Sequence, residues 1–104
     1  MPKYMLAYRG GKQPETPEQG AAQMERWKNW LANLGDAVIN PGTPLPSSKI
    51  VSKSGISDNT DPDRFTGFSV VEADDLESAL AMAKACPFLD MGDLEVAEMI
   101  EMSM

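Results

Sequence analysis

Two arginines are the side chains in this 104-residue sequence that are best suited to hold an anion. Arg9 follows an apolar stretch and Arg64 precedes another. If both stretches are strands of one sheet, the two guanidinium groups can converge and clamp a carboxylate through bidentate hydrogen bonds. The alternative is that both arginines are surface charges that pair with nearby acidic residues. A candidate anion site and a solvated surface both fit this pattern.

Three aspartates, Asp58, Asp61 and Asp63, lie close together in a loop. Several carboxylate oxygens can bind a divalent cation. However, Thr60 and Pro62 interrupt the spacing of a calcium-binding EF-hand loop. Aspartates in turns often accept hydrogen bonds from nearby backbone amides. We therefore predict a solvated turn and no metal site.

Aromatic residues offer a second candidate site. Tyr8 stands on the first apolar stretch, and Trp27 and Trp30 stand on the first amphipathic segment. Rings of this kind can line a ligand pocket and direct a hydroxyl or indole N–H into it. Simple packing in the core is the alternative. Tyr8 and Trp27 join Arg9 and Arg64 as candidate ligand-binding residues.

The sequence contains no histidine and one cysteine, Cys86. Without imidazole, no side chain has an ordinary pKa near neutrality, so Ser-His and Cys-His catalysis would need a partner's histidine. Cys86 ends a predicted helix, where the helix dipole disfavours a thiolate. We expect a small buried residue, no internal disulfide, no cofactor and a reducing compartment.

The net charge of −7 argues against nucleic acid and anionic membranes as partners, because both attract clustered cations. The hydrophobic fraction of 42% is that of a globular protein, and residues 1–104 are expected to form a single domain. The N-terminus lacks the pattern of a signal peptide, and no apolar run is long enough to span a membrane. A cytoplasmic protein is expected.

Strand and helix patterns predict how these residues are positioned. Lys3–Arg9 reads as a central strand, because both of its faces are apolar. Thr16 is a good N-cap, with Gln19 completing a capping box and Gly35 ending the helix near Leu34. The predicted buried stripe of this helix consists of Ala21, Met24, Trp27, Leu31 and Leu34, with Trp30 beside it.

The remainder of the chain predicts further strands and a second helix. The predicted strands are Asp36–Asn40, a small hairpin of Lys49–Lys53 and Ile56–Asp58, then Phe65–Ala73, and a last strand from Leu94 to Met102. Asp74 or Asp75 caps the second helix, and Pro87 ends it. Its predicted apolar stripe is Leu76, Ala79, Leu80, Ala83 and Cys86.

This order, β-α-β-β-α-β with the hairpin inserted, predicts an α+β ferredoxin-like fold with both helices on one face of the sheet. Residues such as Val71, Ala73, Ala97 and Met99, or those alternating with them, would then face water. A second sheet is the simplest cover for that face. We therefore expect a homodimer in which two sheets pack face to face, a dimeric α+β barrel.

Several stretches together resemble the YCII-related, or DGPF-domain, family of small bacterial proteins. They are Lys3–Tyr8, the tryptophan-bearing first helix, Gly67–Ala73 followed by Asp75–Leu80, Ala85–Pro87, and Leu94–Ile100. The resemblance covers nearly the whole chain and implies the dimeric α+β barrel.

Two departures from the family pattern affect the site. The Asp-Gly-Pro-Phe motif should fall before Phe65, where Asp58, or else Asp61, can stand for its aspartate. A histidine–aspartate acid/base pair proposed in some relatives has no counterpart here. The resemblance makes Asp58 the first candidate for a general acid or base, and an ordinary surface carboxylate is the alternative.

The resulting hypothesis is a small homodimer that binds a small organic molecule in a cleft, with an anion as one class of molecule that fits. A cofactor-free lyase or isomerase acting on a small organic acid is the first alternative, because relatives of this fold include such enzymes. An interaction or regulatory module without a ligand is the second.

Overall fold

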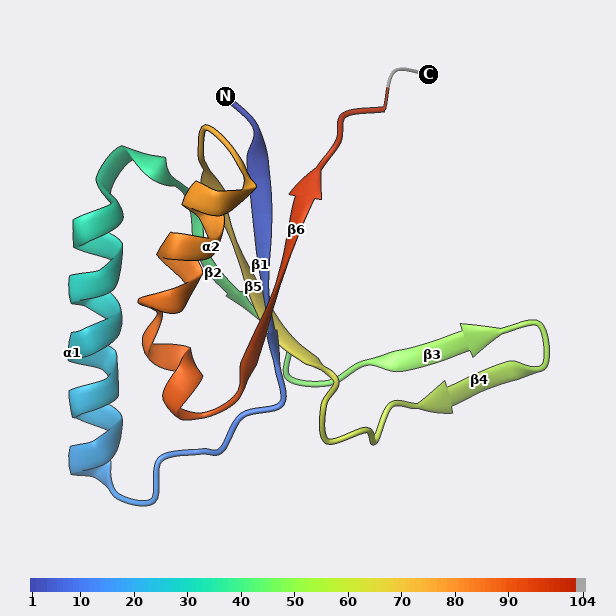
Figure 1. Cartoon of the computed structure of the whole chain (residues 1–104). Helices are drawn as coiled ribbons and strands as arrows, with labels where there is room; N and C mark the ends of the chain where they lie inside the picture. The colour runs from blue at the N-terminus through green and yellow to red at the C-terminus, as the bar shows by residue number, and fades with distance from the viewer. Residues whose placement is uncertain (103–104) are drawn as a thin grey trace.

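The computed structural model describes residues 1–102, and its centre is a four-stranded antiparallel sheet (Figure 1). The strands are β1 (Lys3–Arg9), β2 (Val38–Pro44), β5 (Phe65–Glu72) and β6 (Asp93–Met99), in the order β2-β5-β1-β6. β1 and β5 therefore occupy the centre of the sheet. The fold is the predicted ferredoxin-like α+β arrangement.

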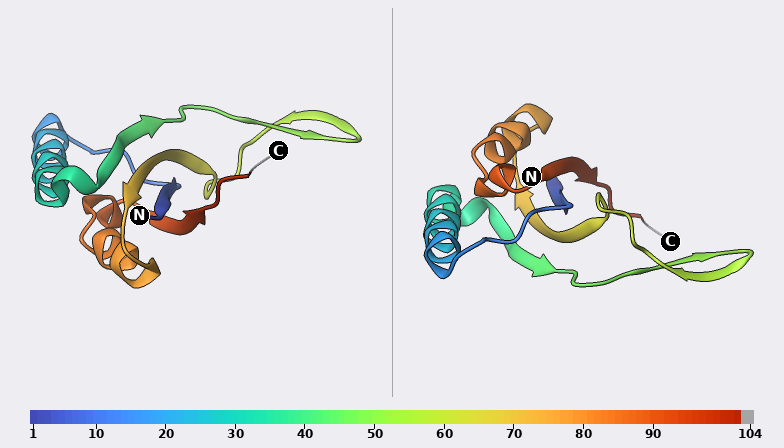
Figure 2. Two further views of the ribbon diagram at one scale, coloured as in Figure 1. Left: turned by 90° about the horizontal axis from the view of Figure 1, so that it is seen from above. Right: turned by 90° about the horizontal axis from the view of Figure 1, so that it is seen from below.

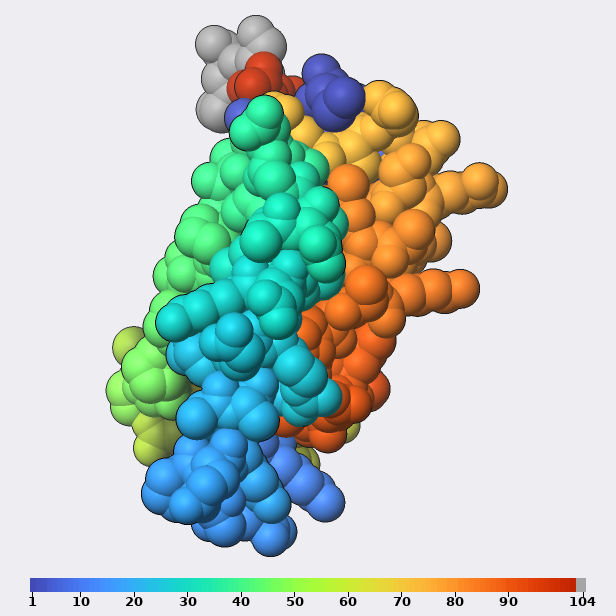
Figure 3. Space-filling view, turned by 90° about the vertical axis from the view of Figure 1, so that its left-hand side faces the viewer, coloured from blue at the N-terminus to red at the C-terminus, as the bar shows by residue number. Residues whose placement is uncertain are grey.

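Two helices, α1 (Pro17–Leu34) and α2 (Leu76–Lys84), lie on the same side of the sheet (Figures 1 and 2). They lie side by side on the outer face of the molecule (Figure 3). The predicted caps are confirmed: Gln19 N donates to Thr16 Oγ1, and Ser78 N donates to Asp75 Oδ1. Gln19 Oε1 accepts from Glu15 N, one residue before the amide expected of a capping box. Gly35, with φ of 57°, ends α1.

The core lies between the sheet and the helices. Leu6 at its centre has no exposed surface, and Trp30 donates its indole N–H to the Met82 carbonyl, 3.0 Å away, which joins α1 to the end of α2. The other buried members of this cluster are Tyr4, Tyr8, Val71, Ala73, Ala79, Ala83, Cys86 and Phe88.

The predicted helix stripes are only partly buried. Trp30 is the buried residue of α1, Trp27, Leu31 and Leu34 are half-buried, and Met24 and Ala21 are exposed. On α2, Ala79 and Ala83 are buried, whereas Leu76 and Leu80 are exposed. The hydrophobic periodicity identified the side of each helix that faces the core, but part of that side stays exposed.

Two strands, β2 and β6, differ most from their predicted bounds. β2 begins at Val38, after a short 3-10 helix over Gly35–Ala37, and continues through Pro41 to Pro44. Proline is tolerated there because β2 is an edge strand. β6 ends at Met99, so Ile100 and Met102 lie beyond the strand and are exposed.

The expectation for the open face was partly wrong. Val71 and Ala73 are buried in the core on the helix side. Directly opposed residues of antiparallel strands share a face, and the register pairs Met5 with Val70 and with Ala97. Met5, Val70 and Ala97 therefore lie on the face without helices.

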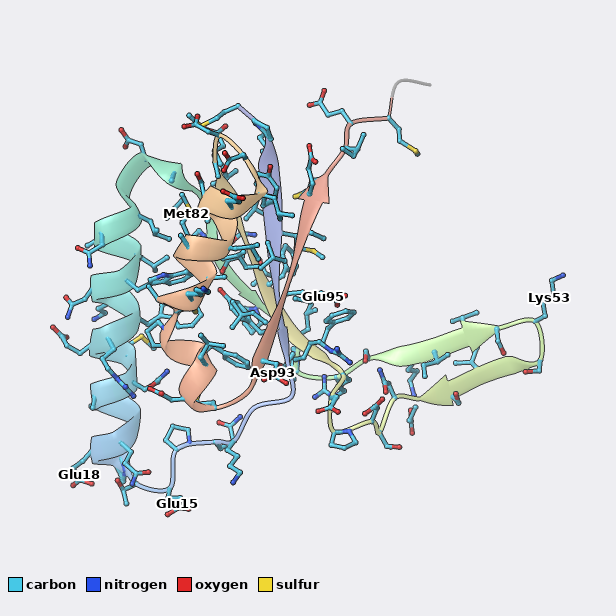
Figure 4. All side chains as sticks on the ribbon, in the orientation of Figure 1. Glu15, Glu18, Lys53, Met82, Asp93 and Glu95 are labelled. Carbon is cyan, nitrogen blue, oxygen red and sulfur yellow. The ribbon has the colours of Figure 1, made fainter. Side chains whose placement is uncertain are left out.

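The inserted hairpin is confirmed, with β3 at Lys49–Ser52 and β4 at Gly55–Asp58. It projects from the sheet, and Lys53 marks its tip (Figure 4). The radius of gyration, 15.2 Å, exceeds the roughly 13 Å of a compact chain of this length because of this arm. Ile50, Val51 and Ile56 are all exposed on it.

Candidate functional site

A cleft between α1 and the loops that follow β1 and precede β5 is the candidate site. Its outer cavity has a volume of about 580 Å³. The polar residues lining it are Lys12, Gln13, Gln23, Thr60, Asp61, Arg64 and Thr66. We refer to this cavity as the polar chamber. Its size is that of a small-molecule site.

A second cavity of about 470 Å³ adjoins the first and is lined mainly by apolar residues. We refer to it as the apolar chamber. Tyr8, Leu31, Pro41 and Pro44 line it. Met24, Trp27, Thr66 and Phe88 line both chambers. The two chambers therefore lie against the same four side chains, and we treat them together as one candidate site.

Three aromatic rings pack together at this boundary: Trp27 and Phe88 line both chambers, and Tyr8 lines the apolar one. The ring of Tyr8 lies 5.3 Å from that of Trp27, edge to face, and 4.9 Å from that of Phe88. Phe88 fits because Gly11 and Gly92 lack side chains: a Cβ on either would approach its ring within 3.0 Å. The rings come from β1, α1 and the 3-10 helix Pro87–Asp90.

A hydrogen-bonded chain fixes Tyr8. Its hydroxyl lies 2.6 Å from Ser69 Oγ, and Ser69 Oγ donates to the Pro41 carbonyl at 3.0 Å. Since Ser69 gives its proton to Pro41, Tyr8 donates to Ser69 and keeps an acceptor lone pair. Burial raises the pKa of the Tyr8 phenol well above its ordinary 10.0. Tyr8 is therefore a neutral positioning group at neutral pH.

Burial likewise raises the pKa of the Cys86 thiol, from 9.0 to about 11. The thiol stays protonated at neutral pH and is a poor nucleophile. Cys86 is buried, as the sequence predicted.

Alkaline unfolding tests these two raised pKa values. The folded protein keeps protons that the unfolded chain releases, so stability is complete below the unfolded pKa values and falls as pH rises through the folded ones. For Cys86 this decline runs from pH 9.0 to about 11, and for Tyr8 it begins near 10.0. Each group contributes a slope of up to ~1.4 kcal/mol per pH unit.

Denaturant titrations of the wild type and Cys86→Ala across this range measure the effect. In the variant, the decline should begin about one pH unit higher, because the groups with a raised pKa that remain are Tyr4 and Tyr8, whose ordinary pKa is 10.0. A decline that begins at the same pH in both proteins contradicts the raised thiol pKa.

The two candidate arginines do not form a clamp. Arg64 lines the polar chamber, but its Nη1 donates to the carbonyls of Leu45 and Phe65 and its Nη2 to that of Pro46. Arg9 is outside the residues lining either chamber: its Nε donates to the Asp63 carbonyl, and its guanidinium lies 5.9 Å from the Phe65 ring. Both brace the base of the hairpin, and Arg64 alone also faces the cleft.

The candidate aspartates are also separated. Asp58 ends β4, is exposed, and forms an ion pair with Lys49 across the hairpin. Asp61 lines the polar chamber, and its Oδ1 accepts from Asp63 N at 2.8 Å. Within residues 1–102, no three acidic or cysteine side chains are grouped as metal ligands would be. Of the two possible counterparts of the family aspartate, Asp61 is the one in the cleft.

Sequence reasoning missed several site residues, above all Lys12, Met24 and Phe88. Met24 was assigned to the core, yet it is exposed at the junction of the chambers. Phe88 carries one usable signal, since it is a large apolar residue directly after the helix-ending Pro87. Lys12 carries none, because a lysine in a polar loop is ordinary.

Comparison with known proteins identifies the family. The model of the YCII-related domain matches residues 3–103. The chain belongs to the YCII-related family. Among curated proteins, none matches this sequence.

Two solved structures are similar to this YCII-related chain. One is 5-chloro-2-hydroxyhydroquinone dehydrochlorinase from Burkholderia phenoliruptrix, in complex with 2,5-dihydroxybenzoquinone, at 14% identity and a TM-score of 0.54, covering 91% of this chain and 90% of the other. Another is the protein At3g17210 from Arabidopsis thaliana, also at 14% identity, with a TM-score of 0.45 and coverage of 100% and 98%. At these identities, the first similarity shows the fold alone.

Proposed function

We propose that this YCII-related protein binds a small organic anion in the cleft of each protomer. The observation that carries the proposal is the composition of the polar chamber, whose lining includes two cationic residues, Lys12 and Arg64, and one carboxylate residue, Asp61. This excess of positive charge stands out in a chain of net charge −7. Tyr8 and Trp27 line the adjoining apolar chamber and supply contacts for the rest of the ligand.

A thermal-shift titration with benzoate and other small ring carboxylates tests this function. Saturating ligand raises the unfolding free energy by mass action, about 2.7 kcal/mol at one hundred times Kd. We expect Lys12→Ala to weaken binding and Lys28→Ala, on the exposed surface of α1, to leave it unchanged. Loss of binding in both variants alike, or no binding at all, contradicts the proposed site and favours an interaction module.

The homodimer is part of this proposal. Its support is the apolar surface left around the open side of the molecule, where Ile39, Phe65 and Met99 are each close to half exposed. A second sheet packed on this side would cover these residues together with Met5 and Ala97. We propose a cytoplasmic location for this homodimer. No helix within residues 1–102 is long and apolar enough to cross a membrane.

Catalysis is a second candidate, favoured by one observation: the fold neighbour in Burkholderia phenoliruptrix is a dehydrochlorinase in complex with a ring compound. By analogy, a cofactor-free lyase or isomerase reaction would need a base in the cleft. Asp61 lines the polar chamber and Asp58 does not, so we assign that role to Asp61. Turnover of a bound acid should be lost in Asp61→Asn and kept in Asp58→Asn.

A further inference from the structure

We propose that the two chambers hold one amphipathic ligand, an aryl-alkanoic acid, with its carboxylate in the polar chamber and its ring in the apolar chamber. This inference rests on the proposed function and specifies the ligand class. A ring carboxylate that occupies a single chamber would satisfy the proposed function but not this one.

The adjacency of the chambers carries the first step. Met24, Trp27, Thr66 and Phe88 line both cavities, so the two cavities meet at these side chains. Each cavity, at about 580 and 470 Å³, is large enough for one end of such a molecule. A ligand held at both ends gains from the high effective concentration of its second end.

The chemistry of the two ends carries the second step. The apolar chamber brings Tyr8, Trp27, Leu31, Pro41 and Pro44 together, a lining that suits a flat hydrophobic ring. Its one phenol hydroxyl donates to Ser69, which leaves that proton unavailable to a ligand. A charged group in this chamber would lose hydration without compensation.

The polar chamber has the opposite character. Lys12 is exposed in the loop after β1, and its ammonium can approach an anion without releasing an existing ion pair of residues 1–102. Arg64 holds the loop at Leu45 and Pro46 through hydrogen bonds to their carbonyls. Neither of these two residues lines the chamber, so we assign the contact with the anion to Lys12. The carboxylate end of the ligand therefore belongs here.

A homologous series distinguishes the two-chamber ligand from a one-chamber ligand. Kd is measured by calorimetry for benzoate, phenylacetate, 3-phenylpropionate and 4-phenylbutyrate. Two reference compounds each lack one feature of the ligand: butyrate lacks the ring, and 4-phenylbutanol lacks the charge. We expect Kd to fall along the series and the best acid to bind at least about 100-fold more tightly than either reference compound, since each tenfold is about 1.4 kcal/mol.

Variants at the junction supply the second arm. Met24 is 56% exposed, so its replacement should leave the fold intact. Met24→Glu places a carboxylate between the chambers and should weaken the best acid more than tenfold while sparing 4-phenylbutanol. Ala21→Glu adds the same charge at an exposed position of α1 outside both cavities and should bind as the wild type does.

The outcomes separate the two proposals. If benzoate binds and is lost in Lys12→Ala, but longer acids bind no better, the two-chamber ligand is wrong and the anion site stands. If the longest acid binds equally well to Met24→Glu, the ligand does not cross the junction and the inference fails. If none of the acids binds, the proposed function fails together with it.

Discussion

Gly92→Ala is expected to destabilise the protein by about 3 kcal/mol and to lower its melting temperature by roughly 10–20 °C. Gly92 lies in the turn between the 3-10 helix and β6. A Cβ there would lie 2.5 Å from the Arg9 carbonyl oxygen and 3.0 Å from Gly11 N, both backbone atoms that cannot rotate away. The turn would have to move from the end of β1.

The same substitution should damage the candidate site, because that Cβ would also lie 2.9 Å from the ring of Phe88, which lines both chambers. Gly20→Ala is the matched control. Its Cβ would meet only Pro14, at an ordinary 3.7 Å, and alanine within a helix should gain about 0.5–1 kcal/mol. Denaturant titration measures the unfolding free energy of both variants. A Gly92→Ala protein as stable as the wild type would show that the turn is not packed on β1.

Ala97→Lys is expected to convert the proposed dimer into a monomer, with a dissociation constant raised at least about 100-fold. Ala97 lies opposite Met5 on the open face and is exposed in the protomer. Lysine there leaves the protomer folded, but between two packed sheets it would bury two unpaired charges at a cost of several kcal/mol. Sedimentation velocity measures the change: the wild type should sediment with twice the 11.3 kDa chain mass, and the variant with the mass of one chain.

Val51→Lys is the control on the hairpin, where Val51 is 74% exposed. This variant should remain dimeric if the sheets form the interface. An isolated two-stranded hairpin is marginally stable in water. The opposite result, in which Val51→Lys is monomeric and Ala97→Lys is dimeric, would place the interface on the arm. A wild type that is monomeric at every concentration would show that the proposed dimer is wrong.

These experiments bear on one another, because the cleft and the proposed interface lie on opposite sides of the sheet. Tyr8 faces the helices and the apolar chamber, whereas its neighbours on β1, Ala7 and Arg9, point to the other side. A monomeric Ala97→Lys protein that still binds acids would show that each protomer carries a complete site. Loss of binding on dissociation would indicate that the partner completes the cleft.

The sequence by itself determined the features that depend on neighbouring residues. Thr16 and Gly35 bound α1, Asp75 caps α2, and the hairpin forms around Ser54 and Gly55. Caps and turns are interactions within a few residues, so local residue types are sufficient to predict them. The order of elements then restricted the fold to the ferredoxin-like arrangement, because strands that flank a helix need a crossover connection.

Only the tertiary structure decided the site. Phe88 reaches Tyr8 across 80 positions of the chain, Asp61 and not Asp58 lines the cleft, and the guanidinium groups of Arg9 and Arg64 bind different carbonyls. Which apolar residues are covered also depends on where the sheet ends, which left Met24 exposed. These outcomes follow from packing between distant segments, and no local pattern of residue types specifies which distant backbone atom or ring a side chain will meet.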